Sequence, residues 1–272
     1  MKTLDQVLID LKNEPDSDDI IKDLLPCSTT SYMLICGRSG IGKTNLVLYL
    51  AFCIATGKKF FSMETQRKKV GYLSFEGGKK QIAKRFQKLM QTFGSAGDYL
   101  RWEHSMPIKL TPKAKEELKG IITGLEVVII DPLRPLVLGD CMKPADASSF
   151  LDSLREVQND TGTIVILIHH IRKPDRKLRV RPEDLLWEIK GATEYVDSAA
   201  TVLLLDRPRH SRDGSGRFQS NLDERILYFT KVKDAPDEFS PLHLQFDRDK
   251  LIFKPVTKLY EYEEGWVEQS ND

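Results

Sequence analysis

Eight residues at positions 37–44, GRSGIGKT, have the composition and spacing of a loop that binds phosphate groups. Glycine lets the backbone curl so that successive N–H groups point at phosphate oxygens, and the helix that follows adds the partial positive charge of its N-terminus. In this pattern Lys43 reaches the β- and γ-phosphates of a nucleotide, and the hydroxyl of Thr44 ligates Mg²⁺. The segment therefore predicts a site for ATP and Mg²⁺ rather than a chance glycine turn. The residues expected to surround the nucleotide are Gly37, Arg38, Ser39, Gly40, Ile41, Gly42, Lys43, Thr44 and Asn45.

Two carboxylates are candidates for the rest of this chemistry. Asp131 follows the apolar run at 127–130, and an acid at the end of a buried strand is the expected Mg²⁺-orienting group. Pro132 comes next, so no second acid stands beside Asp131. Glu76, after the apolar run at 71–75, is the candidate to orient or deprotonate the attacking water, on a strand expected beside that of the phosphate loop. The alternative is that Glu76 caps the helix that follows it.

Short apolar runs alternate with amphipathic stretches, which predicts the elements that position these residues. We expect strands at 32–36, 70–75, 127–130, 164–168, 201–205, 226–230 and 242–246, and helices at 43–56, 79–93, 112–124 and 145–161. Apolar strands separated by helices indicate an α/β fold with a mostly parallel sheet covered on both faces. The strands after residue 200 have no helices between them, which predicts antiparallel strands at one edge. We expect an N-terminal arm with a short helix at 1–26, one ATPase domain at 27–255 and a tail at 256–272.

Composition excludes several classes of protein. With 272 residues, the chain is long enough for one large α/β domain, and 41 Lys and Arg against 40 Asp and Glu rule out binding through overall charge. Its apolar runs are too short to span a bilayer, and charged residues interrupt the first 24 positions, so we expect a cytoplasmic protein with no membrane partner. Its four cysteines are scattered, which argues against a zinc site.

Any contact with nucleic acid must therefore come from a local basic patch, and residues 171–181 supply one. The basic residues are Arg172, Lys173, Arg176, Lys177, Arg179 and Arg181. Such a charge density favours binding to the phosphates of single-stranded DNA without reading its sequence. The segment contains no aromatic residue for base stacking. The alternative is a solvated run of charges.

Four runs together carry a resemblance to a known family: ATGKKFF at 55–61, VGYLSFE at 70–76, DTG at 160–162 and IHHIRK at 168–173. They resemble the RecA-like P-loop ATPases of the RepA type, which are hexameric replicative helicases of plasmids and phages and their single-domain relatives. The resemblance covers roughly residues 25–235. It implies a RecA-like core, a hexameric ring and ATP-driven movement on single-stranded DNA. It also implies that Glu76 is the catalytic glutamate.

The same resemblance assigns further residues. His170 falls at the position of a γ-phosphate sensor, and His169 should point elsewhere because side chains alternate along a strand. Arg85 matches an arginine that the family has in the helix after the catalytic glutamate. Its side chain would contact either the nucleotide or solvent. Lys231 and Lys233 resemble paired cations that reach a neighbouring subunit's γ-phosphate, with Arg207 as the rival and solvated edge-strand lysines as the alternative.

Three functions remain open. The leading one is a ring-forming ATPase that moves on single-stranded DNA, in its most concrete form a RepA-like replicative helicase. The second is a RecA-like switch, scaffold or loader in DNA replication or recombination that does not translocate. A small-molecule P-loop kinase is the third, disfavoured by the glutamate after the second strand and by the lack of a clear arginine-rich lid.

Overall fold

The computed structural model describes residues 2–13, 19–104, 109–171, 193–208, 223–233, 235 and 239–256. Its centre is a nine-stranded sheet. The strands are β1 (Tyr32–Gly37), β2 (Val70–Ser74), β3 (Leu100–His104), β4 (Val127–Asp131), β5 (Ile164–His170), β6 (Thr201–Asp206), β7 (Glu224–Val232), β8 (Leu242–Asp247) and β9 (Ile252–Pro255). Their spatial order is β3-β2-β4-β5-β1-β6-β7-β8-β9.

The sheet is parallel from β3 to β6 and antiparallel from β6 to β9. This confirms the predicted α/β class with antiparallel strands at the C-terminal edge. The expectation that the strand before Glu76 lies beside β1 is wrong, because β4 and β5 separate β2 from β1. Apolar runs identify strands, but each helical crossover is long enough to skip a neighbour, so strand order is decided by packing.

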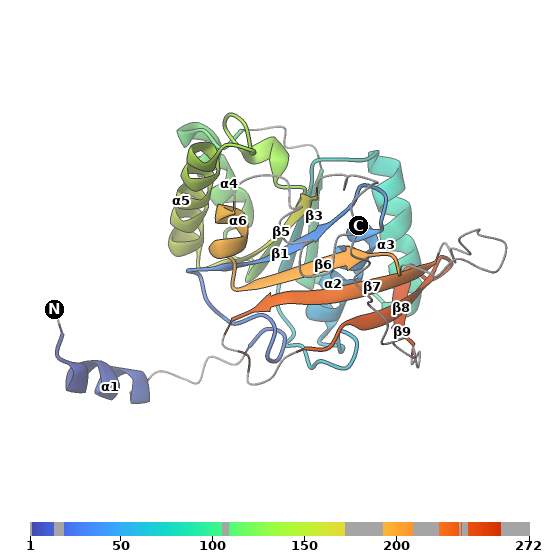
Figure 1. Cartoon of the computed structure of the whole chain (residues 1–272), viewed down its shortest axis with the longest axis horizontal. Helices are drawn as coiled ribbons and strands as arrows, with labels where there is room; N and C mark the ends of the chain where they lie inside the picture. The colour runs from blue at the N-terminus through green and yellow to red at the C-terminus, as the bar shows by residue number, and fades with distance from the viewer. Residues whose placement is uncertain are drawn as a thin grey trace, which may run out of the picture.

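Helices cover both faces of the sheet (Figure 1). One layer holds α2 (Lys43–Thr56) and α3 (Lys79–Phe93), and the other holds α4 (Pro112–Ile122), α5 (Pro144–Thr161) and α6 (Glu194–Asp197). Side chains of β1 alternate between the two cores: Met33 and Ile35 face α2, whereas Leu34 faces α5. The layers hold the C-terminal ends of the parallel strands at one edge, where ligands of such sheets bind.

The predicted helices at 43–56 and 79–93 have those bounds in the structure, and the other two differ from α4 and α5 by at most two residues. Neither β3 nor β9 was predicted. β3 alternates half-buried and exposed residues, so it lacks the apolar run that marks the central strands.

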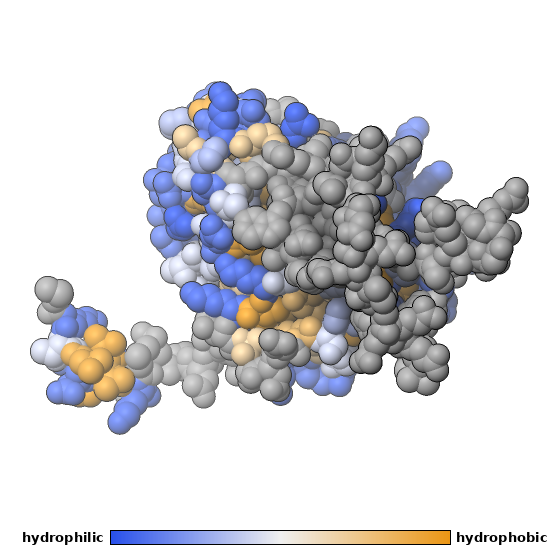
Figure 2. Space-filling model, in the orientation of Figure 1, coloured by the Kyte–Doolittle hydropathy of each residue, from blue (hydrophilic) through white to orange (hydrophobic). Residues whose placement is uncertain are grey.

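The short helix expected within the N-terminal arm does not include the apolar residues at 20–25. This segment forms a turn in which Ile21 bridges to Leu25 and Thr65, and Ile20, Ile21, Leu24 and Leu25 are buried in the core beside α2. A helix lies earlier, as α1 (Leu4–Asn13). Its side chains Leu4, Val7, Leu8 and Ile9 are exposed, with Leu4 at 72% and Ile9 at 53%, and form the apolar cluster at the lower left of Figure 2. In the described part of the chain, no helix has the length and apolar character to cross a membrane.

Gly37, the last residue of β1, is predicted to tolerate no larger side chain. A Cβ there would lie 2.6 Å from the backbone carbonyl oxygen of Leu205 and 3.0 Å from Ile41 Cγ2. Because β6 cannot move away without breaking its pairing with β1, Gly37→Ala should lower the free energy of unfolding by about 1–3 kcal/mol. Chemical denaturation measures this. Gly120→Ala is the control: nothing lies within 4 Å of its Cβ, so helix propensity should raise stability by up to about 1 kcal/mol. Equal stability of Gly37→Ala and the unmodified chain would contradict the steric argument.

Candidate nucleotide-binding site

The predicted phosphate loop connects β1 to α2 at the C-terminal edge of the sheet. Gly40 and Gly42 have φ values of +74° and +110°, which side chains other than glycine rarely adopt. Gly42 is the N-cap of α2, and no side chain caps this helix. The N-terminus of α2 therefore faces the loop with the partial positive charge that favours an anion.

Lys43 is folded into its own loop. Its ammonium donates to the carbonyl oxygens of Gly37 at 2.8 Å and Arg38 at 2.9 Å, and lies 3.1 Å from Nδ1 of His170. The side chain is buried, and this desolvation lowers the pKa of Lys43 to about 8, although Asp131 and Glu76 oppose the shift. The charged oxygens of a triphosphate are stronger acceptors than these neutral groups, so a bound nucleotide would take over the hydrogen bonds of the ammonium.

Asp131 ends β4, and its carboxylate is buried at 8% exposure. Burial raises the pKa of Asp131, while hydrogen bonds from Tyr72 and Thr44 and the charge of Lys43 oppose the shift. The Tyr72 hydroxyl donates to Oδ2 at 2.7 Å. The predicted Mg²⁺ ligands Thr44 and Asp131 are close enough for Thr44 to lower the pKa of Asp131, so both belong to the same site.

This donor set fits Mg²⁺. Hydroxyl and carboxylate oxygens are ligands that Mg²⁺ prefers, and in nucleotide sites the substrate phosphates and water complete its shell. No cluster of three or more His, Cys, Asp or Glu side chains suited to a metal occurs in the described residues. The two protein ligands suit a metal that arrives with a nucleotide better than a metal bound by protein alone.

Glu76 and His170 come together although their strands are not neighbours. Nε2 of His170, at the end of β5, lies 3.8 Å from Oε2 of Glu76. The ammonium of Lys43 can only donate, so Nδ1 of His170 accepts and the ring proton resides on Nε2, which faces Glu76. A continuous polar path thus joins Lys43, His170 and Glu76.

The capping alternative for Glu76 is wrong. The N-cap of α3 is Gly78, no side chain caps this helix, and its first turn contains no acid. Glu76 is exposed and stands between β2 and α3, with its carboxylate directed to the site rather than to the helix.

The neighbouring candidates occupy different environments. His169 is buried on the opposite side of β5 from His170, where its ring lies 5.3 Å from that of Tyr195, as strand alternation predicts. Arg85 of α3 is half-buried, and its charge opposes the rise that burial causes in the pKa of Tyr72. Whether Arg85 contacts a nucleotide stays a prediction.

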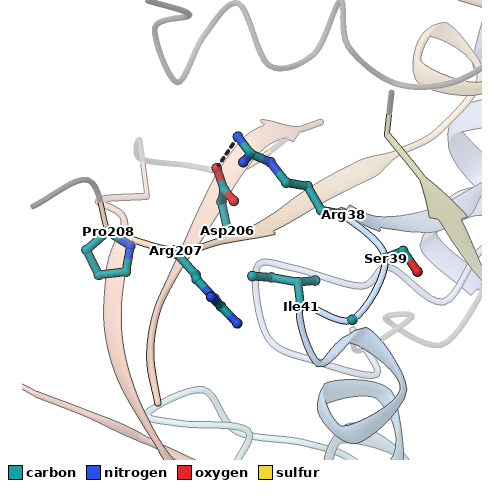
Figure 3. Close-up of a pocket in the computed structure, with 7 residues that line it drawn as sticks. Arg38, Ser39, Ile41, Asp206, Arg207 and Pro208 are labelled. Carbon is teal, nitrogen blue, oxygen red and sulfur yellow. Dashed lines mark hydrogen bonds and ion pairs between the residues drawn. The ribbon is translucent and has the colours of Figure 1, made fainter. Parts of the chain in front are cut away.

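Arg207 lies beside the chain's own phosphate loop. A pocket of about 330 Å³ is bounded by Arg38, Ser39, Gly40, Ile41, Asp206, Arg207 and Pro208. In Figure 3 the Arg207 side chain runs beside Ile41, and Arg38 reaches across to Asp206 at 3.5 Å. Arg207 therefore lies next to the phosphate loop of its own chain.

Lys231 and Lys233 lie near the N-terminal ends of the parallel strands, opposite the ends that hold the phosphate loop. β7 runs antiparallel to β6, so Lys231 pairs with Val202 near the start of β6 rather than with its end beside the phosphate loop. The Lys231 ammonium donates to the carbonyl oxygens of Val196 and Asp197 at 2.9 and 2.8 Å, whereas Lys233 is exposed. Their position excludes contact with the nucleotide of their own chain, and their action on a neighbour stays a prediction.

The predicted DNA-binding residues at 172–181 lie outside the described residues. Other functional residues were missed by sequence reasoning. Tyr72 holds Asp131, and Arg225 of β7 donates through Nε to the Ile41 carbonyl of the phosphate loop at 2.6 Å. The Phe253 ring lies 3.5 Å from where a Cβ of Gly42 would be. Tyr72 and Arg225 occupy apolar strands without a recognisable motif, so only a polar residue among apolar neighbours marks them.

Comparisons with known proteins agree with this geometry. A model of the family described as an AAA domain matches residues 1–176. The search of curated proteins found no match to the chain. Among solved structures, the ATPase domain of G40P has a TM-score of 0.65 and 15% identity, covering 94% of this chain and 100% of that chain.

Two further structures are similar. A DnaB-like replicative helicase, studied with its interactions with primase, has a TM-score of 0.62 and 15% identity, covering 94% of this chain and 68% of that chain. The RadB recombinase has a TM-score of 0.55 and 14% identity, covering 84% and 91%. At such low identity these similarities show the fold alone, and that fold is RecA-like.

Proposed function

The chain belongs to the AAA domain family, and we propose that it is a ring-forming ATPase that uses ATP and Mg²⁺ to move on single-stranded DNA, as a RepA-like replicative helicase. The observation that supports this most directly is the path from Lys43 through His170 to Glu76. It joins the phosphate loop, the proposed sensor and the proposed catalytic acid. The fold similarity to a DnaB-like replicative helicase supports the same function.

In the proposed mechanism ATP enters the loop and its phosphates take the ammonium of Lys43 from the carbonyls of Gly37 and Arg38. His170 then loses its contact with Lys43, so its ring is available to the γ-phosphate. Glu76 accepts a hydrogen bond from the attacking water and aligns it with the phosphorus. Thr44 and Asp131 would hold Mg²⁺, which would supply positive charge to the phosphate oxygens.

A neighbouring subunit supplies the remaining positive charge in this proposal. Lys231 and Lys233 stand far from their own loop, as cations acting on an adjacent subunit's γ-phosphate must. Positive charge delivered there stabilises the phosphoryl-transfer transition state. Arg207, beside its own loop, is better placed to act within its chain. This arrangement requires an oligomer, for which we propose a hexameric ring.

The deciding experiment measures ATP hydrolysis with and without single-stranded DNA, alongside the molecular mass with nucleotide present. A motor is expected to hydrolyse ATP faster on DNA and to form a ring. A nucleotide-dependent switch or loader, the second candidate, should assemble with ATP but show no stimulation by DNA. Its support is the similarity to a recombinase as well as to a helicase.

The basic segment is predicted to carry the DNA contact. Replacing Arg176, Lys177 and Arg179 together with Ser should weaken binding to single-stranded DNA. It should also reduce the slope of log affinity against log salt by about two units, because each lost phosphate contact removes about 0.7. Fluorescence anisotropy over a salt series measures both, and basal ATP hydrolysis should persist.

The control replaces Lys12, Lys22 and Lys69, three exposed lysines elsewhere, with Ser. It removes the same charge and should leave the salt slope nearly unchanged. If both triple variants reduce the slope equally, binding depends on overall charge and the assignment to the basic segment is wrong. An unchanged slope in the first variant would favour the switch over the motor.

A further inference from the structure

Tyr72 forms a hydrogen bond with the carboxylate of Asp131 in the interior of the protein. It lies in β2 with 0% exposure, and its hydroxyl donates to Oδ2 of Asp131 at 2.7 Å. The direction of this bond is fixed, because a carboxylate can only accept and the phenol hydroxyl is the donor. One oxygen of Asp131 therefore has a permanent donor.

The ring that carries this hydroxyl is itself immobilised. Phe86 of α3 packs edge-on against Tyr72, with ring centroids 5.8 Å apart. Phe86 in turn contacts Trp102 of β3 at 5.3 Å and Phe52 of α2 at 6.2 Å. Aromatic side chains from three elements thus set the position of the hydroxyl, which a solvent-exposed donor could not achieve.

Removal of the hydroxyl would leave Asp131 with an unpartnered oxygen in a buried setting. Such a carboxylate would rotate toward Thr44 and Lys43, and this rotation would move its oxygen away from its present position. Partners that orient a metal-ligating carboxylate act through this constraint.

We propose that Tyr72 is a positioning residue: its buried hydroxyl fixes the carboxylate of Asp131 for the Mg²⁺ of the bound nucleotide and so sets how much Mg²⁺ the site requires. This inference rests on the proposed binding of ATP with Mg²⁺. It concerns a side chain that touches neither nucleotide nor metal, and acts through Asp131 alone.

The test compares Tyr72→Phe with Tyr32→Phe in the full chain. Tyr32 is also buried in a strand, and its hydroxyl donates to the backbone carbonyl of Tyr195 at 2.6 Å. It is the first residue of β1, whereas the phosphate loop follows the last. Both variants lose one buried hydrogen bond and should lose similar stability. Binding of a fluorescent ATP analogue is then titrated with Mg²⁺, and binding in EDTA is measured separately.

Tyr72→Phe is expected to raise the Mg²⁺ concentration at half-maximal binding about tenfold, with binding in EDTA unchanged. Tyr32→Phe should keep the original Mg²⁺ midpoint. In an Asp131→Asn background, adding Tyr72→Phe should cause no further shift, because the group that Tyr72 positions has lost its charge. A merely structural tyrosine would instead change the two backgrounds alike.

Two outcomes overturn the inference in distinguishable ways. If the unmodified chain binds the analogue with a Mg²⁺ midpoint that Tyr72→Phe leaves within about twofold, the nucleotide site stands and the role of Tyr72 fails. If the unmodified chain shows no Mg²⁺-dependent binding, the proposed function fails and this role fails with it. A shift of equal size in Tyr32→Phe also overturns the inference, because it would reflect lost stability.

Discussion

Lys43→Ala is expected to abolish ATP hydrolysis and to weaken nucleotide binding about 10- to 100-fold. The ammonium is buried against Gly37, Arg38 and His170, at the place that the β- and γ-phosphates must reach. Alanine removes a charge-assisted contact in a desolvated setting, where such contacts contribute most. Equilibrium binding of a fluorescent ATP analogue and phosphate release measure the two effects.

Lys58→Ala is the matched control for this change. Lys58 follows the C-terminal end of α2, at the opposite end of the helix that begins with Lys43, and is exposed. The Lys58→Ala substitution removes one positive charge from the surface, so ATP hydrolysis should stay normal. Hydrolysis by Lys43→Ala at the rate of this control would show that the loop does not hold the reacting phosphates.

Glu76→Gln is expected to retain ATP binding and lose turnover by at least about 100-fold. The substitution keeps the size of the side chain but removes the charge that aligns and activates water, and general-base assistance contributes about 10²–10⁴-fold. Phosphate release under saturating ATP measures turnover, and analogue binding confirms that the site still fills. Because the 3.8 Å contact with His170 is a weak one, stability should change little.

Glu64→Gln serves as the control, since Glu64 is exposed and pairs with Lys59 away from the site. It should leave turnover and binding unchanged. Near-normal turnover in Glu76→Gln would remove Glu76 from the reaction. A loss of binding equal to the loss of turnover would instead make Glu76 a ligand of the nucleotide rather than the group that activates water.

Features that depend on neighbours along the chain could be predicted from the amino-acid sequence. The phosphate loop is readable because its glycines, lysine and threonine act within one turn, and the structure keeps strand, loop and helix in the predicted register. The helices at 43–56 and 79–93 are likewise local, since their apolar spacing and the glycines beside them set their ends. Uninterrupted apolar runs identified the central strands for the same reason.

Which of these elements come into contact depends on how the chain packs in three dimensions. No local pattern shows that β4 and β5 lie between β2 and β1, or that Glu76 nevertheless reaches His170. The bond from Tyr72 to Asp131 joins residues 59 positions apart, and the one from Arg225 to Ile41 joins residues 184 apart. Such contacts form because the two helical layers bury both faces of the sheet together, and a buried polar group must then find its partner wherever the packing brings one.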